Sequence, residues 1–269
     1  MSLPTSFVDS HFHLYDKGMP FVDSPRHRPD YDFEAEHILK LMDAHGMTHG
    51  VIAGASLYGT YHDNIIRSVR AHKRLRGTVV GDPSLNLYDL ERMAADGIVG
   101  MRLVWISLSD DKLPDIRSYE WRRTLRRIRD LDWHIHLHVG PRRLPAILPA
   151  VVESGAKVVL DHFAYPDVSQ GLNDPTFQAA LKALDSGRTW VKLSAAYRMG
   201  GREAVRPFAE KLLKVAGPGR LLWGSDAPFA SFEGKVTYGE TLEDLKSWIP
   251  DEATRAQITG ATPMSLYFG

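Results

Sequence analysis

Cysteine is absent from this 269-residue sequence. The chain therefore forms no disulfide, binds no metal through thiolates and has no cysteine nucleophile. It also lacks any run that approaches the roughly 20 apolar residues of a membrane span, so we expect no membrane partner. Residues 1–12 contain no basic region followed by an apolar run, which predicts no signal peptide and a cytoplasmic location.

An excess of charge of either sign is missing as well. The chain has 33 lysine and arginine residues and 33 aspartate and glutamate residues, so its formal net charge at pH 7 is zero. We expect no nucleic-acid partner, because binding phosphates requires a basic face. The apolar share of 43% is sufficient for a large buried core.

A short β-rich run, turn residues and a helical stretch follow one another repeatedly along the chain. We predict strands at Ser6–Leu14, Thr48–Ala55, Gly77–Asp82, Gly100–Trp105, Trp133–Val139, Lys157–Phe163, Trp190–Ala195 and Leu221–Asp226. Amphipathic stretches predict helices at Glu34–His45, His62–Arg74, Tyr88–Asp96, Tyr119–Leu131, Leu144–Ser154, Thr176–Ser186, Glu203–Ala216 and Thr241–Trp248. Strands that alternate with helices form βαβ units with a parallel sheet.

Eight such units in about 250 residues are typical of a (β/α)8 TIM barrel. We therefore expect an α/β fold in which residues 1–269 form a single barrel domain, although length alone would also allow two domains. The alternative is an open doubly wound sheet. That fold places a glycine-rich phosphate turn after the first strand, and the segment found there is HFHLYDKG.

Polar and titratable residues end nearly every predicted strand. In strand order they are His11 and His13, Ser56, Asp82, Arg102, His138, His162, Ser194 followed by Arg198, and Asp226. The catalytic groups of TIM-barrel enzymes lie at the C-terminal ends of the strands. The pattern therefore predicts an active site at that end of the barrel.

Residues i and i+2 of a strand share a face. Polar residues alternate with apolar ones in two strands and predict a polar face inside the barrel, formed by Asp9, His11 and His13 in the first strand and by His134, His136 and His138 in the fifth. Lys192 of the seventh strand would also point inward. It would then need a carboxylate partner, for which Asp9 and Asp161 are the candidates.

His11 and His13 form a His-x-His pair with Cα atoms about 7 Å apart, so both rings can approach one ion or one substrate. Such a pair is weak evidence by itself. Combined with His162 and Asp226 at the ends of two other strands, it indicates a catalytic site. His11, His13, His138 and Asp226 would together suit one divalent ion such as zinc.

The segments that carry these residues are VDSHFHLYD, DWHIHLHVG, VVLDHFAYPD and LLWGSDAP. Their order resembles the amidohydrolase superfamily. With GVIAGAS, GMRLVW, WVKLSAAYR and TPMSLYF, the chain is similar from Val8 to Phe268 to the amidohydrolase-related branch of lactone hydrolases, which includes the 2-pyrone-4,6-dicarboxylate lactonases.

The resemblance implies a role for each matching residue. Asp226 would activate the hydrolytic water, and the residues around that water and the scissile carbonyl would be His11, His13 and His162. Two arginines would hold substrate carboxylates and one hydroxyl would lie near the substrate; these are Arg102, Arg198 and Ser56.

The chain also departs from the family pattern. Leu108 stands in place of a further carboxylate-binding arginine after the fourth strand. His138 stands in place of a tyrosine, and we expect it to contact the substrate. Replacement cations are available in the segment after the first strand, at Arg26, His27 and Arg28.

Two alternatives stay open at this point. Some members of the branch work without metal, and arginines near the site would oppose a bound cation, so we expect no required cofactor, with one divalent ion such as zinc as the alternative. Arg102 could also pair with an inner carboxylate such as Asp82 instead of with substrate, because a buried arginine needs a partner.

The sequence thus predicts a hydrolase that opens the lactone ring of a small carboxylate-bearing compound by water attack, with Asp226 as general base. The partner would be a small anionic lactone or carboxylate. The alternatives are a mononuclear metal-dependent decarboxylase, a lactone isomerase of the same superfamily, and a barrel that binds a metabolite without turnover. The sequence leaves the oligomeric state open.

Overall fold

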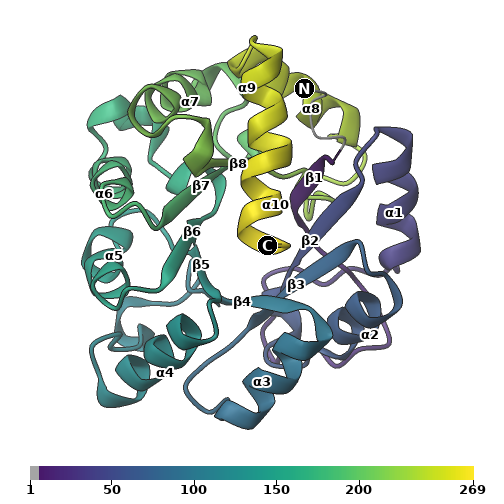
Figure 1. The fold of residues 1–269 in the computed structure, drawn as a ribbon, viewed down its shortest axis with the longest axis vertical. Coiled ribbons are helices and arrows are strands. Elements are labelled where there is room, and N and C mark those ends of the chain that lie inside the picture. The colour runs from purple at the N-terminus through teal and green to yellow at the C-terminus, as the bar shows by residue number, and fades with distance from the viewer. Residues whose placement is uncertain (1–5) are drawn as a thin grey trace.

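The computed structural model describes residues 6–269, in which eight parallel strands form a ring surrounded by helices (Figure 1). The strands follow one another around the ring in the order of the sequence. They are β1 (Val8–Phe12), β2 (His49–Ala53), β3 (Leu75–Val80), β4 (Ile98–Val104), β5 (His134–His138), β6 (Lys157–Leu160), β7 (Thr189–Leu193) and β8 (Leu221–Trp223). This arrangement confirms the predicted (β/α)8 TIM barrel.

A helix follows each strand, as predicted. These helices are α1 (Ala35–Ala44), α2 (Asp63–Ala71), α3 (Leu87–Asp96), α4 (Tyr119–Asp130), α5 (Leu144–Glu153), α6 (Pro175–Leu184), α7 (Arg202–Ala216) and α8 (Tyr238–Trp248). Local signals set several of their starts: a capping box of Thr237 and Glu240 begins α8, and the Asp174 side chain caps α6. Within residues 6–269 no helix is both long and apolar enough to cross a bilayer.

Two further helices were not predicted from the sequence. They are α9 (Glu252–Ala256) and α10 (Thr262–Tyr267), joined by a π-helical turn, and they lie across one end of the barrel (Figure 1). Tyr267 packs there in an apolar cluster with Val8, Val51 and Leu222. This cluster closes the end of the barrel at which the strands begin, so the other end is left for a site.

The barrel closes between β1 and β8. A parallel bridge joins Phe12 to Ala227, and the backbone N–H of Asp226 donates to the carbonyl of His11 over 2.8 Å. Gly224 permits this close approach, because a Cβ atom at that position would collide with the His11 side chain. The loop that follows β8 is therefore fixed against the strand of the His-x-His pair.

The predicted polar face of β5 points into the barrel, and so does His11 of β1, but the prediction is wrong for Asp9. The pairing of β1 with β2 shifts its register between Asp9 and Phe12, so the carboxylate of Asp9 lies on the outer side of the strand and contacts Tyr238 of α8. The rings of His11 and His136, from these two strands, lie with centroids 5.4 Å apart. Phe12 takes the opposite face of β1 and packs toward Met42 of α1. The larger apolar core thus lies between the strands and the helices. Inside the barrel, polar side chains occupy the end where the strands finish, and the apolar cluster around Tyr267 occupies the end where they begin.

Asp9 links β1 to α8 and to the loop after β8, on the outer side of the barrel. Its buried carboxylate accepts hydrogen bonds from the Ser225 backbone N–H (3.0 Å), the Ser225 hydroxyl (2.6 Å), the Tyr238 hydroxyl (2.9 Å) and the His11 backbone N–H (3.1 Å). Burial raises the pKa of Asp9 to about 6, because the loss of water outweighs these four bonds. The carboxylate is therefore mostly ionised at pH 7, and its contacts hold three elements together.

We expect replacement of Asp9 by alanine to lower the free energy of unfolding by about 3 kcal/mol or more, because several buried donors lose their acceptor at once. Tyr238→Phe removes one of these bonds and should cost only about 1 kcal/mol. Urea denaturation followed by circular dichroism measures both changes. Asp185→Ala, at an exposed position, is the control; an equal loss of stability in that variant would contradict the role given to Asp9.

Candidate active site

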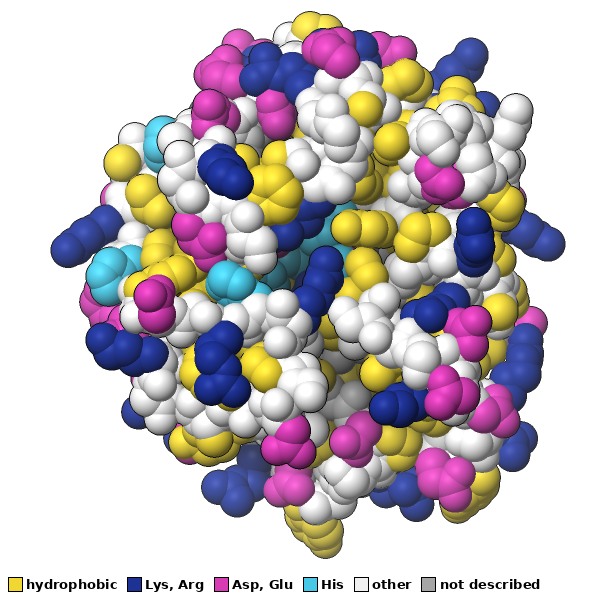
Figure 2. Space-filling view, turned by 180° about the vertical axis from the view of Figure 1, so that it is seen from behind, with side chains coloured by type: hydrophobic (Ala, Val, Ile, Leu, Met, Phe, Trp, Pro, Cys, Tyr) yellow, Lys and Arg dark blue, Asp and Glu magenta, His cyan; other side chains and the backbone are white. Residues whose placement is uncertain are grey.

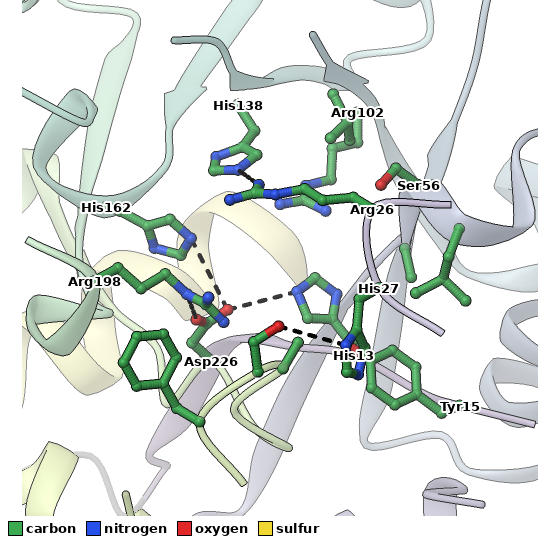
Figure 3. Close-up of a pocket in the computed structure, with 16 residues that line it drawn as sticks. His13, Tyr15, Arg26, His27, Ser56, Arg102, His138, His162, Arg198 and Asp226 are labelled. Atoms are coloured by element: carbon green, nitrogen blue, oxygen red, sulfur yellow. Dashed lines mark hydrogen bonds and ion pairs between the residues drawn. The ribbon is translucent and has the colours of Figure 1, made fainter. Parts of the chain in front are cut away.

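The barrel is hollowed at the end where the strands finish, and histidine and basic side chains line the hollow (Figure 2). The cavity has a volume of about 200 Å³. Its polar lining comes from strand ends and from the loops that follow them: His13, Tyr15, Arg26, His27, Ser56, Arg102, His138, His162, Ser231, Arg198 and Asp226 (Figure 3). A cavity of this size suits a small metabolite.

One oxygen of the Asp226 carboxylate is held by two side chains from the loop after β7. The Tyr197 hydroxyl donates to Oδ2 over 2.6 Å, and the Arg198 Nε donates to the same oxygen over 2.8 Å. The guanidinium of Arg198 also stacks on the Tyr197 ring, with its carbon 4.9 Å from the ring centroid. Arg198 therefore pairs with Asp226, whereas the sequence predicted that it holds a substrate carboxylate.

The other oxygen of Asp226 faces three imidazoles. Oδ1 lies 3.4 Å from Nε2 of His11, 3.5 Å from Nε2 of His13 and 3.9 Å from Nε2 of His162. The structure thus brings together the four residues predicted to form the reaction centre; Figure 3 shows three of them, His13, His162 and Asp226. Oδ2 of Asp226 is thus fixed by hydrogen bonds, whereas Oδ1 faces the imidazole rings and the cavity.

Unusual backbone conformations aim these side chains. Asp226 has a φ of 63° and His162 a φ of 48°, both in the left-handed region that residues other than glycine rarely adopt. Both lie just beyond short strands: His162 is the second residue after β6 and Asp226 is the third after β8. Such positions cost roughly 1–3 kcal/mol each and persist where the surrounding contacts fix them, which is common at functional sites.

A second buried carboxylate, Asp161, lies beneath the cavity. It forms an ion pair with Arg102 (Nη2 to Oδ2, 2.8 Å), accepts a short hydrogen bond from His136, and lies 3.7 Å from the ammonium of Lys192. Of the two candidates predicted for Lys192, the structure therefore selects Asp161; the other, Asp9, bonds to Ser225 and Tyr238 instead. The oxygens of Asp161 are shared among cations and rings that come from four strands.

Arg102 pairs with Asp161 rather than with Asp82, so the salt bridge considered in the sequence analysis forms with a different carboxylate. Its Nη1 also donates to the carbonyl of Gly54 over 2.7 Å. Asp82 caps the turn at Ser84 and is not among the residues that line the cavity. Arg102 nevertheless reaches the cavity wall, because one side of its guanidinium remains free.

His11 connects the two carboxylates. Its Nδ1 lies 3.0 Å from Asp161 and its Nε2 lies 3.4 Å from Asp226. His13 is fixed differently, because its Nδ1 donates to the carbonyl of Ala53 over 2.7 Å. A neutral His13 therefore presents the lone pair of Nε2 to the cavity.

The charges of the site follow from burial and pairing. Burial by itself would raise the pKa of Asp226, but the positive charge of Arg198 and the nearby His162 outweigh it and hold the pKa well below its usual range. Asp161 likewise keeps a low pKa against burial, because of His136, His11 and Arg102. Burial lowers the pKa of His162 to about 4. At pH 7 both carboxylates are charged and His162 is neutral.

Three donor atoms near the mouth suit a divalent ion. Nε2 of His11, Nε2 of His13 and Oδ1 of Asp226 form a triangle with sides of 3.4, 3.4 and 3.5 Å. Ligand atoms about 2.0–2.1 Å from a tetrahedral zinc ion lie roughly 3.3–3.4 Å apart, so the residues present fit such an ion. His138, the fourth member of the predicted ligand set, is not grouped with them within the described chain.

The structure places the other predicted residues in different parts of the site. Ser56 and His138 line the cavity, and so do two of the candidate replacement cations, Arg26 and His27. The third, Arg28, lies outside the cavity, with its guanidinium 4.6 Å from the centre of the Phe21 ring. Ser194 lies behind the wall, where its hydroxyl is 2.8 Å from Nδ1 of His162.

Sequence reasoning missed Tyr197, which donates to the Asp226 carboxylate. A signal for it exists, because Tyr197 directly precedes Arg198 in the loop after a strand end that was already assigned to the site. A tyrosine in a loop has many uses, however, and its hydrogen bond to Asp226 depends on how two loops meet. Tyr15 and Phe232 of the cavity lining were missed for the same reason.

Fold and site together define an α/β barrel with a histidine–aspartate centre at the C-terminal ends of its strands. The chain belongs to the amidohydrolase family, whose model matches residues 8–269. This match confirms the resemblance that the sequence motifs indicated.

Three relatives cover nearly the whole chain. The 4-sulfomuconolactone hydrolase of Rhizobium radiobacter is 26% identical over 276 residues, which are 99% of this chain and 91% of the relative. The 2-pyrone-4,6-dicarboxylate hydrolase of Comamonas testosteroni is 25% identical over 283 residues, with the same shares. The D-galactarolactone isomerase of Agrobacterium fabrum is 23% identical over 276 residues, 99% of this chain and 92% of the relative.

A similar solved structure is that of a probable 2-pyrone-4,6-dicarboxylic acid hydrolase from Acinetobacter baumannii, with citric acid bound. It superposes with a TM-score of 0.93 at 28% sequence identity, over 98% of this chain and 100% of that chain.

We expect Arg102→Met to lower the free energy of unfolding by about 3–5 kcal/mol at pH 7, because it leaves the buried charge of Asp161 without its closest cation. The pairing lowers the pKa of Asp161 in the folded state, so its contribution is present above the unfolded pKa and disappears as the pH falls. The cost of the substitution should therefore stay nearly constant from pH 7 to about pH 5 and shrink only as the pH falls below about 4. Arg28→Met is the control in the same urea titrations; equal stability of both variants at pH 7 would refute the assignment.

Proposed function

We propose that the chain is a hydrolase that opens the ring of a small carboxylate-bearing lactone, with Asp226 as the general base for the attacking water. The observation that carries this proposal is the divided environment of the Asp226 carboxylate. Oδ2 is fixed by Tyr197 and Arg198, while Oδ1 faces the imidazoles and the cavity. The lactone hydrolases among its relatives support the same chemistry.

In this reaction, water adds to the carbonyl carbon of the ring while one of its protons passes to Oδ1 of Asp226. The bond between that carbon and the ring oxygen then breaks, and the ring oxygen takes the proton from Asp226 as it leaves. The product is an open hydroxy acid. The imidazoles of His11, His13 and His162 orient the water and face the charge that develops in the transition state.

The low pKa of Asp226 limits which lactones can react. A carboxylate held ionised by Arg198 is a weak base toward water. A good leaving group, such as an enol or a sugar hydroxyl, lowers the demand on the base. The proposed substrates are therefore activated lactones, and the arginines of the cavity select those that carry an acidic group.

The reaction as proposed requires no metal. Arg102 and Arg198 are paired with carboxylates, and the positive charge of Arg26, the third arginine of the cavity, opposes the entry of a metal cation. If an ion is bound, His11, His13 and Asp226 would hold it, and it would polarise the carbonyl as a Lewis acid.

The cytoplasmic location remains an expectation from the sequence.

An isomerase is the second candidate, because one relative is a D-galactarolactone isomerase. The same residues could serve it, with a substrate hydroxyl in place of water. Turnover in H2 18O distinguishes the two reactions. Hydrolysis places one 18O atom in the product and isomerisation places none, as mass spectrometry would show.

Asp226→Asn should lower kcat by about three orders of magnitude on a panel of anionic lactones, since a positioned base contributes roughly 10²–10⁴-fold. Asp82→Asn is the matched control, because Asp82 also lies just beyond a strand, β3, but outside the cavity. The measurement is hydrolysis followed by proton NMR. Normal turnover by the Asp226 variant would remove Asp226 from the role of base.

Dialysis against a chelator should change kcat by less than about twofold if no metal is required. The residual metal content is measured by mass spectrometry on the same samples. A loss of activity that zinc restores would overturn the metal-free proposal and assign the donor triangle to a catalytic ion.

A further inference from the structure

Arg26 is a cation of the cavity without a carboxylate partner. It lies in the loop between β1 and α1, and its Nη1 is 3.5 Å from Nε2 of His138. The other two arginines of the cavity are paired, Arg102 with Asp161 and Arg198 with Asp226. Among residues 6–269 no carboxylate lies within ion-pair distance of Arg26.

Two buried nitrogens of the cavity wall make no hydrogen bond within the described chain. They are Nε of Arg102 and Nδ1 of His138, on side chains that are 3% and 6% exposed. Nδ1 of His138 lies 3.7 Å from Oδ2 of Asp161, beyond hydrogen-bond distance. Buried polar atoms normally find a hydrogen-bond partner, so unpaired ones in a cavity wall indicate a missing ligand. The guanidinium of Arg102 in particular has a free donor after Gly54 and Asp161 are satisfied.

These three side chains form one wall of the cavity. In Figure 3, Arg26, Arg102 and His138 lie together on one side, while Asp226 and Arg198 lie on the other. The cavity therefore has a reaction end and a cationic end. We define the cationic wall as Arg26, Arg102 and His138.

The loop that carries Arg26 is held in place before any ligand arrives. Pro25 and Pro29 flank the segment and restrict its backbone. His27 lies 3.4 Å from the Ser231 hydroxyl and 3.1 Å from Glu233, both in the loop after β8. A guanidinium positioned in this way loses less entropy when it binds an anion.

We propose that the cationic wall is a subsite for a second acidic group of the substrate, and that Arg26 is its specificity-determining residue. This inference rests on the proposed function and names its substrate class, a lactone with a carboxylate on the side of the ring away from the scissile carbonyl. The planar guanidinium of Arg26 suits a bidentate contact with a carboxylate. In the segment after β4, Leu108 stands in place of an arginine of the family pattern and does not line the cavity. Arg26 supplies the missing cation from the loop after β1.

The binding test uses citrate, which needs no turnover. Wild-type protein should bind citrate in a calorimetric titration, and Arg26→Gln should weaken the affinity about tenfold or more, since it removes a charged hydrogen-bond donor. Arg26→Lys should fall between the two, because it keeps the charge and loses the fork. The control is Arg28→Gln, two residues away and outside the cavity, which should bind as the wild type does.

Arg26 makes no ion pair within the described chain, so the melting temperature of Arg26→Gln should equal that of the wild type, and a loss of affinity would not reflect misfolding. Equal citrate affinities of Arg26→Gln and Arg28→Gln would overturn the proposal. So would the absence of citrate binding by wild-type protein at millimolar concentration.

A kinetic test compares 2-pyrone-4,6-dicarboxylate with 2-pyrone-6-carboxylate, which has the same ring and one acidic group fewer. Arg26→Gln should raise KM about tenfold for the dicarboxylate and leave KM for the monocarboxylate and both kcat values nearly unchanged. An equal rise of both KM values would overturn the assignment of Arg26 to the second acidic group. If wild-type protein binds citrate through Arg26 but hydrolyses neither compound, the hydrolase proposal fails and the subsite stands.

Discussion

Two buried carboxylates, Asp161 and Asp226, stay ionised in a barrel that is closed at the end where its strands begin. The rest of the site depends on the ion pairs that keep them ionised. An unpaired buried charge would cost several kcal/mol, so each carboxylate needs cations or donors within reach. Asp161 has Arg102 and Lys192 beneath the cavity, and Asp226 has Arg198 at the mouth. The positions of the surrounding rings follow from these pairs, because the oxygens that remain free accept or face the imidazoles.

This pairing also distinguishes the arginines that neutralise a buried carboxylate from the one that does not. An arginine that neutralises a buried carboxylate is partly used for that purpose and has fewer donors for a substrate. Arg198 is bound in this way to Asp226, whereas Arg26 has no carboxylate partner within the described chain. In the proposed function, Asp226 therefore activates water at one end of the cavity and Arg26 selects anionic molecules on the opposite wall.

The fold was predictable because its signal repeats. Eight strand–helix units set the barrel, and the polar residues at the strand ends indicated where the site lies. The prediction failed for α9 and α10, which follow the last strand and therefore belong to no repeating unit. It also placed Asp226 in the last strand, whereas β8 ends at Trp223 and Asp226 lies in the left-handed region of the backbone beyond it.

The sequence by itself determined the barrel and the set of residues His11, His13, His162 and Asp226, because each lies in or just after a strand end and all strand ends of a parallel barrel meet at one mouth. Only the tertiary structure decided which charge pairs with which: Arg102 with Asp161, Arg198 with Asp226, and Arg26 with no carboxylate of the described chain. The physical reason is that ion pairing depends on distances of a few ångströms between loops far apart in the chain. Residue periodicity sets the direction of a side chain, but not the partner that it meets.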